Sequence, residues 1–248
     1  MRSGFPGIMS AALPRREVFT PTDLSNLSVW YDATDFNFIT KDGSNLVSSW
    51  GDKSGGGNNA TATGGDRPLL QANEQNSLPT INFDATDQMD LPSGLFSVPN
   101  GNSTLFIVSQ RASESGNLEA VFSLSDGTAL DYFLVYATAA GTVTYKSRDG
   151  AAGSLSSAGH TLTNYNILRG RRSGTTQALA VNGATEVTNA SGVSSAGIDS
   201  GDIGAGNADN FLLTGNIGEI ILYNTSLSAA NILLVETYLA NKWGLTLA

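Results

Sequence analysis

The sequence contains no cysteine and a single histidine, His160. The lack of cysteine excludes disulfide bonds, thiolate nucleophiles and zinc sites with cysteine ligands. One histidine cannot supply a metal site with several imidazole ligands. No Gly-x-Ser-x-Gly motif surrounds any serine that His160 could activate. We therefore expect neither a zinc centre nor serine or cysteine hydrolase chemistry.

Charged residues and long apolar segments are also scarce. Charged residues make up 14% of the chain, and 22 acidic residues against 13 basic ones give a net charge of −9. This charge repels phosphate backbones, so we expect no nucleic-acid partner. No segment approaches the roughly 20 apolar residues that a membrane span needs. The weak apolar stretch near the start is broken by Gly4, Pro6 and Gly7, which argues against a cleaved secretory signal.

Small and turn-forming residues are abundant, with 28 glycines in 248 residues. This composition is typical of short strands joined by many turns, and one β-sandwich can use a chain of this length. Residues 1–22 carry three prolines and no periodicity, so we expect an extended N-terminal arm followed by one packed domain at residues 23–248. Short runs with β-forming residues recur at 27–31, 80–83, 104–110, 119–124, 132–136, 143–146, 164–172 and 178–181.

Two longer segments carry more specific signals for strands. Residues 178–187 contain Asn182-Gly183, which can supply both positive φ angles of a type I′ turn and predicts a hairpin. Residues 211–224 are interrupted by Gly215 and Gly218. They predict either two strands or one bulged strand.

Only the C-terminal segment has the pattern of a helix. Ser228 can cap its first turn, and Gly244 can end it. Apolar residues recur at helical spacing at positions 232, 235, 239 and 243. We expect this apolar stripe to close one end of the sandwich.

Two blocks of sequence resemble the laminin-G-like branch of the concanavalin-A-like lectin/glucanase superfamily. The first block lies at residues 29–35, 47–55, 67–68 and 81–84, and the second at residues 215–224, 227–228 and 235–244. The resemblance covers about residues 24–246 and implies a jelly-roll sandwich of two antiparallel sheets. The family pattern usually has an acidic residue in the first helical turn, where this chain has Asn231.

Modules that resemble this one are frequent in bacteriophage structural proteins and in large extracellular bacterial proteins. The resemblance therefore implies a non-catalytic virion structural protein, either a capsid decoration or a tail component. Its arm would bind other virion or assembly subunits, most simply as a homo-oligomer. A second hypothesis is an extracellular adhesin that binds host or environmental polysaccharide, and a third is an exported glycoside hydrolase.

The acidic residues do not favour the hydrolase. Glycoside hydrolysis needs two carboxyl groups about 5–10 Å apart. On one strand face such acids would stand two or four residues apart, and no pair in the sequence has either spacing. Carboxylates on different strands could still meet, so the hypothesis stays open, but we expect no enzyme.

One group of acids predicts a cation site. Asp84, Asp87 and Asp90 lie close together, and calcium in sandwich loops is often held by aspartate side chains. The alternative is a solvated loop in which Asp84 caps a turn. We expect no other cofactor.

Two further groups of side chains have a structural interpretation. A dense basic cluster is interpreted as a solvated strand face, with an anion site as the alternative; it comprises Arg169, Arg171 and Arg172. The three tryptophans lie in the blocks that resemble the family, so we expect core packing rather than contact with sugar rings; they are Trp30, Trp50 and Trp243.

Overall fold

The structure is a computed structural model of the 248-residue chain. It describes residues 18–93, 102–114, 116–125, 130–136, 139–147, 154–190, 200–206 and 211–248. The helical elements are η1 (Pro21–Asp23), η2 (Phe36–Phe38) and α1 (Ala229–Trp243). All other regular structure in these residues is β, as the composition predicts.

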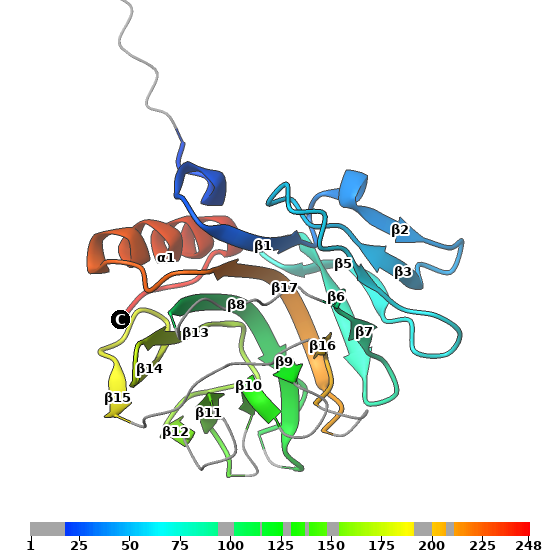
Figure 1. Cartoon of the computed structure of the whole chain (residues 1–248). Helices are drawn as coiled ribbons and strands as arrows, with labels where there is room; N and C mark the ends of the chain where they lie inside the picture. Colours follow the sequence, from blue (N-terminus) through cyan, green and yellow to red (C-terminus); the bar gives the residue numbers. More distant parts are fainter. Residues whose placement is uncertain are drawn as a thin grey trace, which may run out of the picture.

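The strands form two sheets, shown in Figure 1. Sheet A contains β1 (Leu27–Asp32), β5 (Leu69–Gln75), β6 (Leu78–Asp84), β8 (Ser103–Arg111), β13 (Asn166–Ser173), β14 (Thr176–Val181), β15 (Val187–Ala190) and β17 (Thr214–Tyr223). Sheet B contains β2 (Ile39–Lys41), β3 (Val47–Trp50), β4 (Ala60–Thr61), β7 (Met89–Asp90), β9 (Glu119–Ser125), β10 (Leu130–Tyr136), β11 (Val143–Ser147), β12 (Ser154–Ser157) and β16 (Ser200–Ile203).

Every named strand pair is antiparallel, and strands distant in sequence lie next to each other. Sheet A runs β15-β14-β13-β8-β17-β6-β5, with β1 also paired to β17. Sheet B runs β12-β11-β10-β9-β16-β7-β4-β3-β2. The prediction of an all-β sandwich with two antiparallel sheets and a short C-terminal helix is confirmed.

The main core lies between the sheets and is built from alternate residues of each strand. Trp50, Ile81, Phe122 and Ile220 are completely buried there. Antiparallel strands present side chains to opposite faces in turn, so the intervening residues face outward. Trp30 and Trp243 are also buried, which confirms the core interpretation of the three tryptophans.

Helix α1 has the predicted ends but a different position from the one expected. The Ser228 hydroxyl accepts a hydrogen bond from the Asn231 backbone N–H, and Gly244 ends the helix with φ 65°. The apolar stripe packs against residues of β8, β13 and β17, including Phe106 and Ile221. The helix therefore covers the outer face of sheet A instead of closing an end of the sandwich (Figure 1).

The two segments with specific strand signals also form. Residues 214–223 make one bulged strand, β17, with its register shift between Ile217 and Glu219. Asn182 and Gly183 both have positive φ, at 51° and 72°, as the type I′ prediction requires. The ladder resumes only at Val187, which pairs with Leu179. The hairpin loop is therefore longer than a two-residue turn.

The predicted N-terminal arm lies mostly outside the described residues, because the description begins at Val18. Phe19 packs edge-to-face against Tyr238 of α1, with ring centroids 6.2 Å apart. The Tyr223 hydroxyl donates to the Pro21 carbonyl over 2.9 Å. The last residues assigned to the arm are therefore attached to sheet A and its helix. No described helix has the length and apolar character to cross a membrane.

Candidate functional site

The three predicted calcium ligands follow one another along β6, a turn and β7. Asp84 and Asp87 meet, because the Asp87 carboxylate accepts the Asp84 backbone N–H over 3.1 Å. The Asp84 carboxylate also accepts hydrogen bonds from the backbone N–H and the hydroxyl of Thr86. Asp84 therefore caps a turn, as the alternative to a calcium site predicts. Asp90 lies on β7. In the described residues no three aspartate, glutamate, histidine or cysteine side chains gather as a metal site would require. Calcium binding stays a prediction.

Asp87 gives this turn a dependence on pH. Burial and the nearby Asp84 carboxylate raise the pKa of Asp87 to about 6. The unfolded pKa is about 3.9, so the folded state binds more protons between these two values. The free energy of unfolding therefore falls as the pH rises from about 4 to about 6.

We expect Asp87→Asn to raise the free energy of unfolding by about 1 kcal/mol at neutral pH, a value reduced for solvent screening at a surface turn. The amide oxygen can still accept from the Asp84 backbone. Near pH 4 both versions are uncharged, so the difference should disappear. Urea unfolding at the two pH values measures both effects. An equal gain at both would contradict the argument.

The outer face of sheet B presents a continuous set of polar side chains, here called the cross-strand row. Residues directly opposite on neighbouring antiparallel strands project from the same face. One residue from each of six neighbouring strands is paired in this way: Thr40, Ser49, Thr61, Asp90, Asp202 and Ser123. The residues next to them in sequence, which face the core, are Ile39, Trp50, Ala60, Met89, Ile203 and Phe122.

All six side chains of the row end in oxygen, as hydroxyls or carboxylates. Thr40, Thr61 and Asp90 are exposed, whereas Ser123 at the far end is buried. The five strands from β2 to β16, which carry the accessible members of the row, span roughly 19 Å at the usual spacing. The row can therefore contact an elongated hydroxyl-rich molecule, with hydroxyls donating and carboxylates accepting.

Asp90 and Asp202 stand directly opposite each other within the row. The Ser123 hydroxyl donates to Asp202 over 3.5 Å. The two carboxylates lie on separate strands, so no spacing within one strand predicts the pair. Like charges in direct cross-strand pairs are unfavourable.

Two exposed phenylalanines lie next to β2, the strand at one edge of sheet B. Phe36 is 61% exposed and Phe38 is 39% exposed, both on η2 immediately before β2. The Phe38 carbonyl accepts the Gly51 N–H, which continues the β2–β3 ladder. Lys53 forms an ion pair with Asp35 over 2.9 Å. The aromatic rings are therefore held on an ordered turn next to Thr40.

A buried ionic network joins β1, β17 and α1 on sheet A. Glu219 is fully buried and accepts hydrogen bonds from Trp30, Tyr238, Lys242 and Trp243 over 2.7–2.8 Å. Lys242 also binds Asp32, the cross-strand neighbour of Glu219, over 2.7 Å.

Opposing effects set the charges in this network. Burial alone would raise the pKa of Asp32, but the ion pairs with Lys242 and Lys53 outweigh it and hold the pKa below its usual value. Burial raises the pKa of Glu219, and Lys242 opposes that shift. Because protein donors already serve both carboxylates, we assign the network to holding α1 against β1 and β17.

The basic cluster is not a solvated face. Arg169 and Arg172 are buried. Arg169 forms ion pairs with Glu186 and with Glu236, the latter over 2.8 Å, and Arg171 forms one with Glu186. The anions that bind Arg169 and Arg171 are therefore side chains of the chain itself, from the hairpin loop and from α1.

His160 has one of the two contacts that a catalytic histidine would need. Its Nε2 lies 2.8 Å from the Ser157 hydroxyl, and burial lowers its pKa. Within the described part of the chain no carboxylate bonds to the other ring nitrogen. The orienting third group of a Ser-His-Asp triad is thus not among these residues.

Comparison with known proteins gives structural matches but no sequence matches. No protein-family model matches the chain, and no curated protein matches its sequence. Solved structures do match. A Trypanosoma rangeli sialidase in complex with sialic acid has TM-score 0.62 and 14% identity, covering 88% of this chain and 33% of that chain. The botulinum neurotoxin serotype D binding domain has TM-score 0.63 and 14% identity, covering 86% and 51%.

A mutant of the NanB sialidase from Streptococcus pneumoniae also matches, with TM-score 0.50 and 21% identity, covering 62% of this chain and 26% of that chain. The chain therefore spans about a quarter to a half of the length of these structures. At such low identity the matches establish the fold alone. They are consistent with a concanavalin-A-like sandwich.

Proposed function

We propose that the protein is a non-catalytic carbohydrate-binding sandwich that holds polysaccharide along the outer face of sheet B. The cross-strand row carries this proposal. It offers hydroxyl and carboxylate groups on five neighbouring strands, from β2 to β16, without a basic side chain among them. A sugar chain supplies the matching hydroxyls, each able to donate and accept.

Phe36 adds the apolar contact that sugar recognition needs. A pyranose ring presents C–H groups on its face, and an exposed aromatic ring can stack against them. The position of Phe36 on the turn before Thr40 puts such a ring at one end of the row. The sialidase neighbour, whose structure contains bound sialic acid, supports a carbohydrate partner by analogy of fold.

Glycoside hydrolysis is the alternative function, because a retaining glycosidase needs two nearby carboxyl groups and Asp90 and Asp202 are cross-strand neighbours. A general acid must also be protonated near neutral pH, which usually requires an apolar, desolvated surrounding. Asp90 is exposed and has no such surrounding. This supports binding without hydrolysis.

We expect Phe36→Ala to weaken polysaccharide binding about tenfold, which corresponds to about 1.4 kcal/mol. Thr61→Val, which replaces a hydroxyl in the row by a methyl group, should weaken it about threefold. Isothermal titration against neutral polysaccharides that bind in an initial array screen measures both. Leu233→Ala is the matched control, because Leu233 is 58% exposed but lies on α1 at the far side of sheet A.

Three outcomes would count against this proposal. If no polysaccharide in a broad array binds, the row has no carbohydrate role. If Leu233→Ala weakens binding as much as Phe36→Ala, the contact lies elsewhere. If reducing ends appear and Asp90→Asn stops their release, the protein is a hydrolase.

A place on a virion surface, and an arm that binds neighbouring subunits, remain predictions. The structural neighbours include two sialidases and a toxin binding domain. A carbohydrate-binding sandwich is compatible with a virion or an extracellular location, and the proposal does not depend on either.

A further inference from the structure

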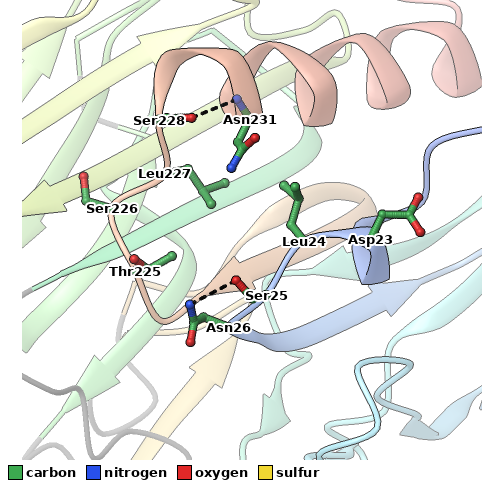
Figure 2. Close-up of a pocket in the computed structure, with 9 residues that line it drawn as sticks. All are labelled: Asp23, Leu24, Ser25, Asn26, Thr225, Ser226, Leu227, Ser228 and Asn231. Carbon is green, nitrogen blue, oxygen red and sulfur yellow. Dashed lines mark hydrogen bonds between the residues drawn. The ribbon is translucent and has the colours of Figure 1, made fainter.

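A recess lies between two loops at the start of α1. It has a volume of about 310 Å³. We call it the loop pocket. Its lining comprises Asp23, Leu24, Ser25, Asn26, Thr225, Ser226, Leu227, Ser228 and Asn231 (Figure 2). This volume is at the lower end of ligand pockets, so it fits a small molecule.

The loop that enters β1 is fixed by hydrogen bonds that do not involve a ligand. The Asn26 carbonyl accepts the Asn224 N–H over 2.8 Å, and Asn26 has a positive φ of 65°. Asp23 accepts the Thr20 N–H over 2.7 Å. Asn26 is therefore held in a conformation that few residues other than glycine, asparagine and aspartate adopt readily.

The loop that leaves β17 is fixed in the same way. The Thr104 hydroxyl donates to the Thr225 carbonyl over 2.9 Å and accepts the Leu227 N–H over 3.0 Å. Arg171 binds the Ser226 hydroxyl from behind. Both walls of the pocket are thus positioned before any ligand arrives, which lowers the entropy loss on binding.

The polar groups in the loop pocket retain hydrogen-bonding capacity. The side-chain amide of Asn231 and the hydroxyl of Thr225 have no protein hydrogen-bond partner among the described residues. Ser25 and Asn26 contact only each other through their side chains, over 3.4 Å. In Figure 2 the Asn231 amide points toward the space between Leu24 and Leu227. The pocket therefore combines an apolar floor with amides and hydroxyls on two sides.

The charge of the lining residues favours an uncharged ligand over an anionic one. No lysine, arginine or histidine lines the pocket, and its one ionisable residue is Asp23. An anionic ligand would find no cation among the lining residues, and the negative charge of Asp23 would repel it. A neutral polyhydroxy compound would match the amides and hydroxyls.

We propose that the loop pocket binds one uncharged sugar unit, either a free monosaccharide or the end of a glycan, and discriminates against sialic acid and other acidic sugars. This site is separate from the cross-strand row and does not depend on the proposed function of that face. It uses loops attached to sheet A, whereas the row belongs to sheet B.

Amide chemical shifts of the full chain test this inference. Glucose, galactose, mannose and N-acetylglucosamine are titrated, with their methyl glycosides standing for glycan ends. At least one should give saturable shifts at Asn26, Thr225 and Asn231, with a millimolar Kd. N-acetylneuraminic acid should bind at least about tenfold more weakly, and Asp23→Asn should reduce that difference. Shifts with the glycosides but not the free sugars would assign the pocket to glycan ends.

Asn231→Ala should weaken the sugar's affinity about fivefold by removing the free amide. Asn241→Ala on the same helix is the matched control, since Asn241 is exposed and outside the pocket. The proposal is overturned if no neutral sugar gives saturable shifts, if N-acetylneuraminic acid binds as tightly, or if Asn231→Ala and Asn241→Ala behave alike. Shifts confined to Thr61 and Asp90 would overturn it too, while supporting the cross-strand row.

Discussion

Lys242→Met should lower the free energy of unfolding by about 3 to 5 kcal/mol, the largest loss that we expect from one side chain. The ammonium group binds Asp32 over 2.7 Å and Glu219 over 2.8 Å, and both carboxylates are buried. Without Lys242 these two cross-strand neighbours would repel each other, and Glu219 would keep only neutral donors. Urea unfolding followed by tryptophan fluorescence measures the loss, because Trp30 and Trp243 both donate to Glu219.

Two further variants separate the ionic effect from the loss of packing. Lys41→Met removes an exposed lysine whose one partner among the described residues is Asn45, so it should change stability by less than about 0.5 kcal/mol. Adding Glu219→Gln to Lys242→Met removes the unpaired charge and should recover part of the loss. If the double variant is less stable than Lys242→Met alone, the ionic explanation is wrong.

Gly218→Ala should destabilise the protein by about 2 to 3 kcal/mol through overpacking. Gly218 lies at the bulge of β17, and its carbonyl accepts the Ala33 N–H over 3.0 Å. A Cβ at this position would lie 2.5 Å from the ring of Trp243, which is completely buried. The indole would have to move, and its hydrogen bond to Glu219 would be disturbed. The melting temperature should fall by roughly 5 to 10 °C.

Gly43→Ala is the matched control for this change. A Cβ at Gly43 meets no atom within 4 Å, and Gly43 does not have a positive φ. The substitution should leave the melting temperature within about 2 °C of the original. Near-ultraviolet circular dichroism should show an altered tryptophan signal only in Gly218→Ala. Equal melting temperatures for the two variants would show that Trp243 has room to adjust.

Much of the fold was predictable because its signals are local. The ends of α1 follow from Ser228 and Gly244, each of which acts on its own turn. The longer strands have enough residues to show β-forming runs between turns. The strands β4 (Ala60–Thr61) and β7 (Met89–Asp90) have two residues each, too few for a period, and only pairing with neighbours defines them.

The candidate site was less predictable because it depends on register between distant strands. Asp202 gains its place in the cross-strand row from pairing with Asp90 and Ser123, and no spacing in the sequence encodes that pairing. The same holds for Arg169, whose partners Glu186 and Glu236 come from other elements. Phe36 carries a local signal, because it is an aromatic residue between Asp35 and Asn37 in a segment without strand periodicity.

The pairing of β1 with β17 has a consequence for biosynthesis. The bonds of Glu219 to Trp30 and of Lys242 to Asp32 join residues 189 and 210 positions apart. Such distant contacts slow folding, because a large loop must close before they form. During synthesis, β1 cannot complete these contacts until β17 and α1 have been made. Until the segment up to Trp243 has been synthesised, the strands that pair with β17 have an open edge, and the apolar face that α1 covers is exposed. We expect the risk of aggregation to be greatest during this interval.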